Sequence, residues 1–479
     1  MNHYRKPIYE ALKKHWDKHP VSLHVPGHKY GIVNPVEQDF FFDQIMKLDA
    51  TELSGLDDLH HPEGVIKEAE DLLADLYGVQ NSYLLVNGTT VGNLAMILAT
   101  IQEGDVVFVQ RNCHKSILNG ISLVKAVPVF LEPEYYPEWR VSGGISLYTL
   151  EQAFQMYRNV TALILTYPNY YGMVYELEKL IKLAHQHRVP VLIDEAHGAH
   201  FIAGAPFPKS AVQLGADVVV QSAHKTLPAL TMGSFFHFNS SLISRISIEK
   251  YLYLLQSSSP SYVLMASLDN ARSYLATYRD EDKQYMIGEI QQFIEELEEI
   301  KEIKVLVFPN QLGDRLKLTV QSLTSLTGFE LQQLLEGEGV YTELADPHNI
   351  LMVLPLLKNG VDFPFTYIIE SIKKVVNNYS LKEKPIYLPL RENKIRKLEL
   401  NHEQIERIKK KDVLIIDAVG QICAESVIPY PPGIPLLLPG ELITIEDVET
   451  IKELIQLGAR FQGRNEITSG RLSIYAIGD

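Results

Sequence analysis

The sequence predicts an α/β fold with a mostly parallel sheet, followed by a smaller α+β region. Between about residues 64 and 240, short apolar segments alternate with segments of helical periodicity, an order typical of strands joined by crossover helices. Several segments are apolar throughout, as strands covered on both faces must be. The expected strands are 83–86, 106–109, 127–130, 162–165, 191–193 and 218–220.

The helices between these strands follow from the spacing of apolar residues. Apolar side chains recur at positions 66, 69, 72, 73 and 76, so we expect one helical face over 65–77. Gly78 follows at the position that commonly ends a helix. A second helix is expected over 176–187. The mixed segment 1–50 contains one expected short helix, at 7–17.

The C-terminal part of the chain has a different pattern. A turn-like break at 257–261 precedes a charged helix from about 279 to 300. Beyond it the expected strands are 304–307, 316–318 and 350–353, and the expected helices are 328–336, 364–377 and 445–457. We therefore expect an N-terminal segment (1–50), a large α/β domain (51–300) and a C-terminal α+β region (301–479).

Composition excludes several classes of function. The 479 residues carry a net charge of −15, which argues against a nucleic-acid partner. Two cysteines, Cys113 and Cys423, can build neither a disulfide framework nor a four-cysteine zinc site, and they suggest the cytoplasm. We expect no signal peptide, no membrane-spanning helix and no metal site, because the spacing of His185, His187 and His200 matches no metal motif.

An acidic pair directly follows one expected strand. The apolar run 191–193 is followed by Asp194, Glu195, Ala196 and His197. Ligands of open α/β sheets bind beyond the carboxyl ends of the strands, so Asp194 can reach a ligand. It can equally be a turn or N-cap residue. A helicase interpretation of these letters fails, because the chain has no Gly-x-x-x-x-Gly-Lys-Ser/Thr phosphate loop.

Two further segments follow expected strands. A predicted helix is preceded by Gly88, Thr89 and Thr90. Backbone amides and hydroxyls at such a helix start can bind a phosphate. An ordinary N-cap threonine gives the same sequence pattern. Ser222-Ala223-His224-Lys225 follows the strand at 218–220. A lysine there can act as a nucleophilic amine, although a single lysine is usually a solvated surface residue.

Together these segments contain what pyridoxal 5′-phosphate (PLP) requires. The cofactor needs a Schiff-base lysine, a carboxylate at the pyridine nitrogen, a phosphate site and a group stacked on its ring. Lys225, Asp194 and the turn at 88–90 provide the first three, and His114 in the segment 112–116 can provide the fourth. Each lies at a strand end or in the loop that follows it.

The sequence resembles the bacterial ornithine/lysine/arginine decarboxylases, which are fold-type-I PLP enzymes with a transferase-like large domain. It resembles short members, which lack an N-terminal receiver-like domain. The resemblance covers nearly the whole chain and includes the segments 24–29, 57–62, 87–90, 112–116, 194–198, 222–225 and 429–435.

The resemblance implies roles for individual residues. Lys225 would carry the cofactor as a Schiff base, and Asp194 would pair with the pyridine nitrogen. His114 and Ala196 would pack on the two faces of the ring. The other residues expected around the cofactor, mainly at its phosphate, are Gly88, Thr89, Thr90, His197, Ser222 and His224. Ser257 or Ser258 of a second subunit would also reach the phosphate, which makes a homodimer with interfacial active sites the expected active unit.

The implied reaction is the release of CO2 from a basic amino acid, with arginine first, lysine second and ornithine third. Lys225, Asp194 and His224 are the expected catalytic residues, and either His224 or Lys225 would reprotonate Cα. A carboxylate would bind the distal cation of the substrate; Asp57, Asp58 and Glu425 are candidates, although each can be an ordinary turn or surface carboxylate. An aminotransferase, a lyase or a non-catalytic PLP-binding protein are the alternatives.

Overall fold

In the computed structural model, the chain forms two compact units. The first unit comprises Met1–Thr100 and Ala184–Arg279, and the second comprises Ile101–Leu183 and Asp280–Asp479. The structure describes residues 1–34, 40–309, 312–382, 394–430, 434–462 and 465–477, so part of the expected proline-rich motif at 429–435 lies outside it. Within these ranges, no helix has the length and apolarity needed to cross a membrane.

The first unit contains four strands of the predicted sheet. Their order is β1 (Asn81–Leu85), β9 (Ser234–Phe238), β8 (Val218–Gln221) and β7 (Val191–Asp194). Strands β7 and β8 are parallel, whereas β9 is antiparallel to both β8 and β1. The helices of this unit are α1 (Pro7–Trp16), α2 (Phe40–Leu48), α3 (Val65–Tyr77), α4 (Gly88–Thr100), α8 (Ala223–Thr226), α9 (Arg245–Leu255) and α10 (Tyr262–Ala276), with a short 3-10 helix at Phe201–Ala203.

Helix α4 packs unusually close to this sheet because of one glycine. A Cβ atom on Gly92 would lie 2.4 Å from Cγ1 of Val220 and 2.7 Å from Cδ1 of Leu85, so any larger residue would push the helix away from β8 and β1. The close approach holds the N-terminus of α4, at Gly88, beside the carboxyl ends of these strands. The expected phosphate turn is therefore positioned by the core of the first unit.

The second unit contains the other strands of the predicted sheet. Their order is β6 (Val160–Thr166), β2 (Val106–Gln110), β3 (Val127–Leu131) and β14 (Ile395–Lys397). The first three are parallel, and β14 is antiparallel to β3. The accompanying elements are α5 (Lys115–Leu123), β4 (Tyr135–Tyr136), β5 (Val141–Ser142), α6 (Leu147–Met156) and α7 (Leu177–Gln186), which continues into the first unit.

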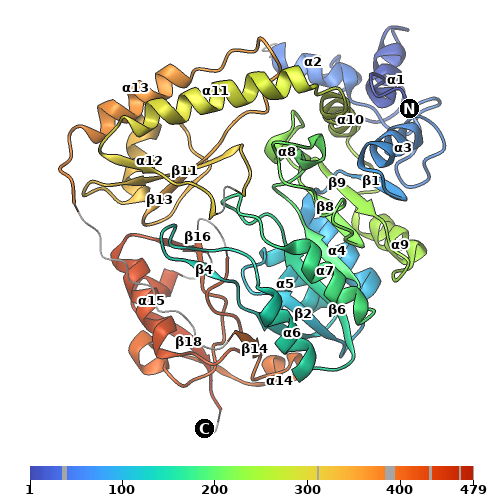
Figure 1. Cartoon of the computed structure of the whole chain (residues 1–479). Helices are drawn as coiled ribbons and strands as arrows, with labels where there is room; N and C mark the ends of the chain where they lie inside the picture. Colours follow the sequence, from blue (N-terminus) through green and yellow to red (C-terminus); the bar gives the residue numbers. More distant parts are fainter. Residues whose placement is uncertain (35–39, 310–311, 383–393, 431–433, 463–464, 478–479) are drawn as a thin grey trace. The chain divides into compact units, whose positions relative to one another are not determined.

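The rest of the second unit is α+β, as the sequence predicts. An antiparallel sheet has the order β10 (Ile303–Val305), β11 (Lys317–Ser322), β13 (Asn349–Val353) and β12 (Leu344–Ala345), and α13 (Phe365–Val376) packs against α11 (Asp280–Glu298) and α12 (Gly328–Gly337) (Figure 1). A last group has its own apolar core. It consists of α14 (His402–Arg407), β15 (Lys410–Leu414), β16 (Ile428–Tyr430), α15 (Ile445–Gln456), β17 (Arg460–Gln462) and β18 (Arg471–Tyr475), with 3-10 helices at Ile415–Ala418 and Asn465–Ile467.

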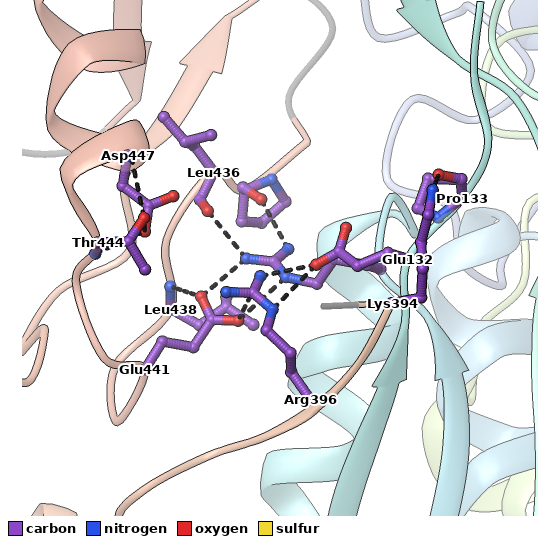
Figure 2. Close-up of polar contacts among 11 residues, drawn as sticks. Glu132, Pro133, Lys394, Arg396, Leu436, Leu438, Glu441, Thr444 and Asp447 are labelled. Atoms are coloured by element: carbon purple, nitrogen blue, oxygen red, sulfur yellow. Dashed lines mark hydrogen bonds and ion pairs between the residues drawn. The ribbon is translucent and has the colours of Figure 1, made fainter. Parts of the chain in front are cut away.

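A buried ion-pair network fixes this last group within the second unit. Glu441 lies 2.9 Å from the guanidinium of Arg111, which follows β2, and both side chains are buried. Arg111 also donates to the carbonyl oxygens of Pro435 and Leu436. Figure 2 shows Glu441 beside Arg396 of β14, whose guanidinium lies 2.7 Å from Glu132.

Glu441→Gln is expected to destabilise the protein by about 3 to 5 kcal/mol, because it leaves the buried Arg111 cation without its closest counter-charge. The measurement is urea unfolding followed by circular dichroism. The control is Glu178→Gln, which removes the exposed ion pair with Lys182 and should cost less than about 1 kcal/mol. Equal effects of the two substitutions would contradict the assigned role of Glu441.

Glu70 lies beside the edge strand of the first unit's sheet. This α3 residue is 5% exposed, and its Oε1 accepts a hydrogen bond from the Leu84 N–H of the edge strand β1. Burial raises the pKa of its carboxyl from 4.5 to about 8. The carboxyl is therefore protonated in the folded protein at neutral pH, and it ionises when the chain unfolds.

Glu70→Gln should make the protein less sensitive to alkali. The wild-type carboxyl stabilises the fold fully below pH 4.5, and this contribution is lost as the pH rises to about 8, at about 1.4 kcal/mol per pH unit. The amide keeps the acceptor for Leu84 and does not ionise. The melting temperatures of the two proteins are measured at pH 5 and pH 8. Relative to the wild type, the variant should have a higher melting temperature at pH 8 than at pH 5. The same difference at both pH values would refute this.

Candidate active site

The predicted strand-end residues lie together in the first unit. Asp194 is the last residue of β7, Lys225 lies in α8 directly after β8, and Gly88 begins α4. Because β7 and β8 are parallel, their carboxyl ends open at the same edge of the sheet. The segments that were predicted separately from the sequence therefore lie at one edge of this sheet.

Asp194 is buried and held in a fixed orientation. Its side chain is 2% exposed. Oδ2 accepts a hydrogen bond from Nδ2 of Asn93 at 2.9 Å, and Oδ1 accepts one from the Ala196 N–H at 3.2 Å. Sequence analysis missed Asn93, which lies on α4 and is fully buried. The sequence feature that could have indicated Asn93 is a side-chain amide among the mostly apolar residues of a predicted helix.

Three hydroxyl groups gather at the start of α4. Oγ1 of Thr89 lies 2.6 Å from Oγ of Ser222 and 3.0 Å from Oγ of Ser234. Hydroxyls next to the N-terminus of a 13-residue helix are suited to a phosphate. Ser234 begins β9 and was not predicted, whereas the side chain of the predicted Thr90 is exposed.

Lys225 contacts an imidazole. Its Nζ lies 3.1 Å from Nε2 of His197, and the His197 side chain is 4% exposed. The neighbouring His224 donates from Nδ1 to the carbonyl oxygen of Gly233 at 3.0 Å. The loop before β9 therefore fixes the His224 ring.

The predicted serines lie in the loop between α9 and α10. The Ser257 N–H donates to Oδ1 of Asn87, directly before Gly88, and Nε2 of His60 donates to the Ser257 carbonyl oxygen. The side chains of Ser257 and Ser258 are exposed. The backbone of this loop is thus bound next to the phosphate turn of its own chain.

Two predicted residues belong to the second unit. His114 caps α5: its Nδ1 accepts from the Ser116 N–H at 3.2 Å and lies 2.8 Å from the Ser116 hydroxyl. Oε1 of Glu425 accepts from the Ser473 N–H at 2.6 Å. The stacking role of His114 and the substrate role of Glu425 stay predictions.

Asp57 and Asp58 are both engaged with backbone. The Asp57 carboxylate accepts from four N–H groups at the start of α3, those of Glu63, Gly64, Ile66 and Lys67. Burial raises the pKa of Asp57, but these hydrogen bonds outweigh burial and leave the pKa below its ordinary value. Asp58 accepts one hydrogen bond, from the His60 N–H. Asp57 therefore serves as a cap for α3.

The side chains of the first unit suit PLP chemically. They supply an amine, a buried carboxylate and a cluster of hydroxyls next to backbone amides, which match the aldehyde, the pyridine nitrogen and the phosphate of that cofactor. Among the residues that the structure describes, no group of three or more His, Cys, Asp or Glu side chains could hold a metal ion.

Thr89→Val is expected to weaken PLP binding about 10- to 100-fold, because a hydrogen bond to a charged group contributes about 1.5 to 3 kcal/mol and the valine also leaves Ser222 and Ser234 without this partner. Titration of the apoprotein with PLP gives the dissociation constant. Thr89→Ser keeps the hydroxyl and should bind nearly as the wild type. Equal affinities for all three proteins would remove Thr89 from the site.

Comparisons with known proteins identify the family. The model of the Orn/Lys/Arg decarboxylase major domain matches residues 6–321, and that of the Orn/Lys/Arg decarboxylase C-terminal domain matches residues 384–471. The chain is 44% identical over 476 residues to the Bacillus subtilis protein YaaO, with 98% of each chain covered. It is 33% identical over 486 residues to the arginine decarboxylase of the same organism, covering 98% of this chain and 97% of the relative.

A solved structure confirms the fold. The constitutive lysine decarboxylase of E. coli superposes with a TM-score of 0.78 at 19% sequence identity, covering 98% of this chain and 82% of that one. The predicted fold class, an α/β PLP-enzyme fold with a C-terminal α+β part, is therefore confirmed. The chain belongs to the Orn/Lys/Arg decarboxylase family, and it is a PLP-dependent amino-acid decarboxylase.

Proposed function

We propose that the chain releases CO2 from arginine, with lysine as the second and ornithine as the third choice of substrate. The observation that carries the choice of arginine is the 33% identity to an arginine decarboxylase over nearly the full length of both chains. The lysine decarboxylase of matching fold shares 19% of its residues with this chain.

In this proposal the first unit binds the cofactor. Lys225 would hold the cofactor through its aldehyde carbon, and Thr89, Ser222 and Ser234, whose hydroxyls lie together, would hold its phosphate. Gly88 and Thr90 complete the phosphate turn, and Ala196 and His114 pack on the ring. When bound, PLP accepts the electron pair that remains on Cα after CO2 leaves.

Asp194 keeps a proton on the pyridine nitrogen in this scheme. Its carboxylate is already oriented by Asn93 and by the Ala196 N–H, so no reorganisation is needed when charge develops during the reaction. Preorganised charges of this kind commonly make the largest contribution to catalysis. His224 or Lys225 returns the proton to Cα.

The distal cation of the substrate needs a carboxylate. Asp57 is a poor candidate, because its oxygens accept four backbone hydrogen bonds. Asp58 and Glu425 each accept one backbone hydrogen bond among the described contacts, which leaves acceptor capacity for a guanidinium. We therefore keep these two as candidates.

The proposed active unit is a homodimer in the cytoplasm. The exposed side chains of Ser257 and Ser258 lie on a loop that is anchored through its backbone, as a loop that reaches into a second subunit requires. Both cysteines are buried thiols outside any disulfide, which fits a reducing compartment.

The test incubates the PLP-loaded protein separately with arginine, lysine and ornithine, and measures CO2, the amine and any keto acid. We expect equal amounts of CO2 and amine and the highest kcat/KM for arginine. A higher value for lysine would overturn the substrate choice. Production of keto acid without CO2 would make the chain an aminotransferase.

A further inference from the structure

The contact between Lys225 and His197 has a chemical consequence. Nζ of Lys225 lies 3.1 Å from Nε2 of His197. We propose that His197 is the proton partner of Lys225: its imidazole carries protons to and from Nζ whenever the lysine bonds or releases the carbonyl carbon of the cofactor. This inference rests on the proposed role of Lys225 as the residue that binds PLP.

The turn that carries His197 is held rigidly behind β7. The Glu195 N–H donates to the carbonyl oxygen of Val220, and the Gly198 N–H donates to that of Glu195. The buried Glu195 carboxyl group, whose pKa burial raises to about 8, accepts from the Ser210 hydroxyl, the Ala211 N–H and the side-chain amide of Gln221. These bonds fix the backbone on both sides of His197.

The close packing of this turn leaves little freedom for the imidazole. A Cβ atom on Gly198 would lie 2.7 Å from Cγ of Glu195, so the chain turns there against the glutamate side chain. His197 itself is buried. The position of the imidazole in this contact is therefore set by the fold of the first unit.

Lys225 needs such a partner because an ammonium ion has no electron pair with which to attack. An imidazole can both accept and return a proton, which makes histidine a common general acid and base. In contact with Nζ, it can take the proton at the moment of attack.

The protons balance in this step. The ammonium group begins with three protons, and the N–C bond forms after His197 has taken the first. The carbonyl oxygen then leaves as water with two of the three protons, delivered through His197, and one proton stays on the nitrogen of the C=N bond. His197 ends in its starting state. When a substrate amine releases Lys225, no water forms; two protons pass from the incoming ammonium group to Nζ through His197, which again ends in its starting state.

Other titratable groups near the turn are engaged elsewhere. Asp194 accepts from Asn93 and from the Ala196 N–H, and the Glu195 carboxyl group has its three donors. Nδ1 of His224, the neighbour of Lys225 in α8, faces the Gly233 carbonyl oxygen. The contact of Nζ on which the proposal rests is the one with Nε2 of His197.

The test measures how fast the full-length apoprotein captures PLP, from the visible absorbance of the bound cofactor. His197→Gln keeps a polar side chain but cannot carry a proton, and His197→Ala opens space for an external base. Both variants should capture PLP about 100-fold more slowly, within the usual range for general acid–base catalysis. Imidazole in solution should restore the rate of His197→Ala in proportion to its concentration, and should not restore His197→Gln.

Two controls separate a proton-transfer role from a structural one. The same substitution at the exposed His187 should leave capture unchanged, and circular dichroism checks that each variant is folded. Wild-type capture by His197→Gln would overturn the proposal. So would a folded His197→Ala that imidazole does not rescue, because a purely structural role predicts that result.

The two proposals fail in different ways. If Lys225 captures PLP through His197 but no basic amino acid releases CO2, the proposed function is wrong and the proton partner stands. If CO2 is released while both His197 variants capture PLP at the wild-type rate, the proton partner is wrong and the proposed function stands.

Discussion

Lys225→Ala is expected to lower CO2 release at least about 10³-fold, because it removes the amine that bonds the cofactor and with it the covalent step of the reaction. The phosphate site at Thr89, Ser222 and Ser234 is untouched, so the variant should still bind PLP, but without the absorbance of the covalent form. The measurements are CO2 release from arginine and the visible spectrum of the loaded protein.

The control for this prediction is Lys250→Ala, which removes an exposed lysine of α9 in the same unit. It should release CO2 at nearly the wild-type rate. Turnover and the covalent spectrum in Lys225→Ala at wild-type levels would show that another amine holds the cofactor, and the site would have to be rebuilt around that residue.

Asp194→Asn is expected to lower kcat by about 10² to 10⁴, the range in which single preorganised polar groups act in catalysis. The amide has nearly the same shape and can keep a contact with Asn93, but it carries no charge to hold a proton on the pyridine nitrogen. The measurement is kcat for CO2 release, together with the dissociation constant for PLP.

A second substitution tests the orientation of this carboxylate. Asn93→Ala removes one of the two described donors to Asp194 and leaves the Ala196 N–H in place, so we expect a smaller loss, about 10-fold, which corresponds to about 1.4 kcal/mol. If Asp194→Asn kept full activity, the carboxylate would have no electrostatic role. If Asn93→Ala were as inactive as Asp194→Asn, the charge alone would not explain the effect.

The apolar runs of the sequence located most of the sheet correctly. The runs 191–193 and 218–220 lie within β7 and β8, which are buried at every position, and no polar residue falls inside either run. Helix α3 begins and ends at the predicted residues, and Gly78 ends it with a left-handed φ of 66°. The local pattern of apolar residues was therefore sufficient to predict strands that are buried throughout and a helix with one apolar face.

Strand β9 was missed because polar residues interrupt it. Ser234 and His237 lie in a strand that is buried throughout, and each has its partner far away in the sequence: Ser234 lies beside Thr89, and His237 lies beside Ser82 and Gln221. A buried polar residue is tolerated when it is hydrogen-bonded, and a single sequence does not reveal such partners.

The same reason limits what could be predicted of the site. Asp194 and Lys225 were found because each directly follows an apolar strand, a feature that is local in the sequence. Asn93 was missed because its partner Asp194 is 101 residues away. Helices α2, α9 and α10 were also not predicted. In α9, Ile248 and Leu252 are buried whereas Ile246, Tyr253 and Leu254 are exposed, so the apolar residues of its sequence are not confined to one face.

The most direct test of this account is to locate the cofactor. The PLP-loaded protein is reduced with borohydride, digested, and its peptides are analysed by mass spectrometry. The account predicts a single pyridoxyl group on Lys225, in the peptide that contains Ser222 and His224, and none in Lys225→Ala. A pyridoxyl group on a different lysine, or its persistence in Lys225→Ala, would contradict the account.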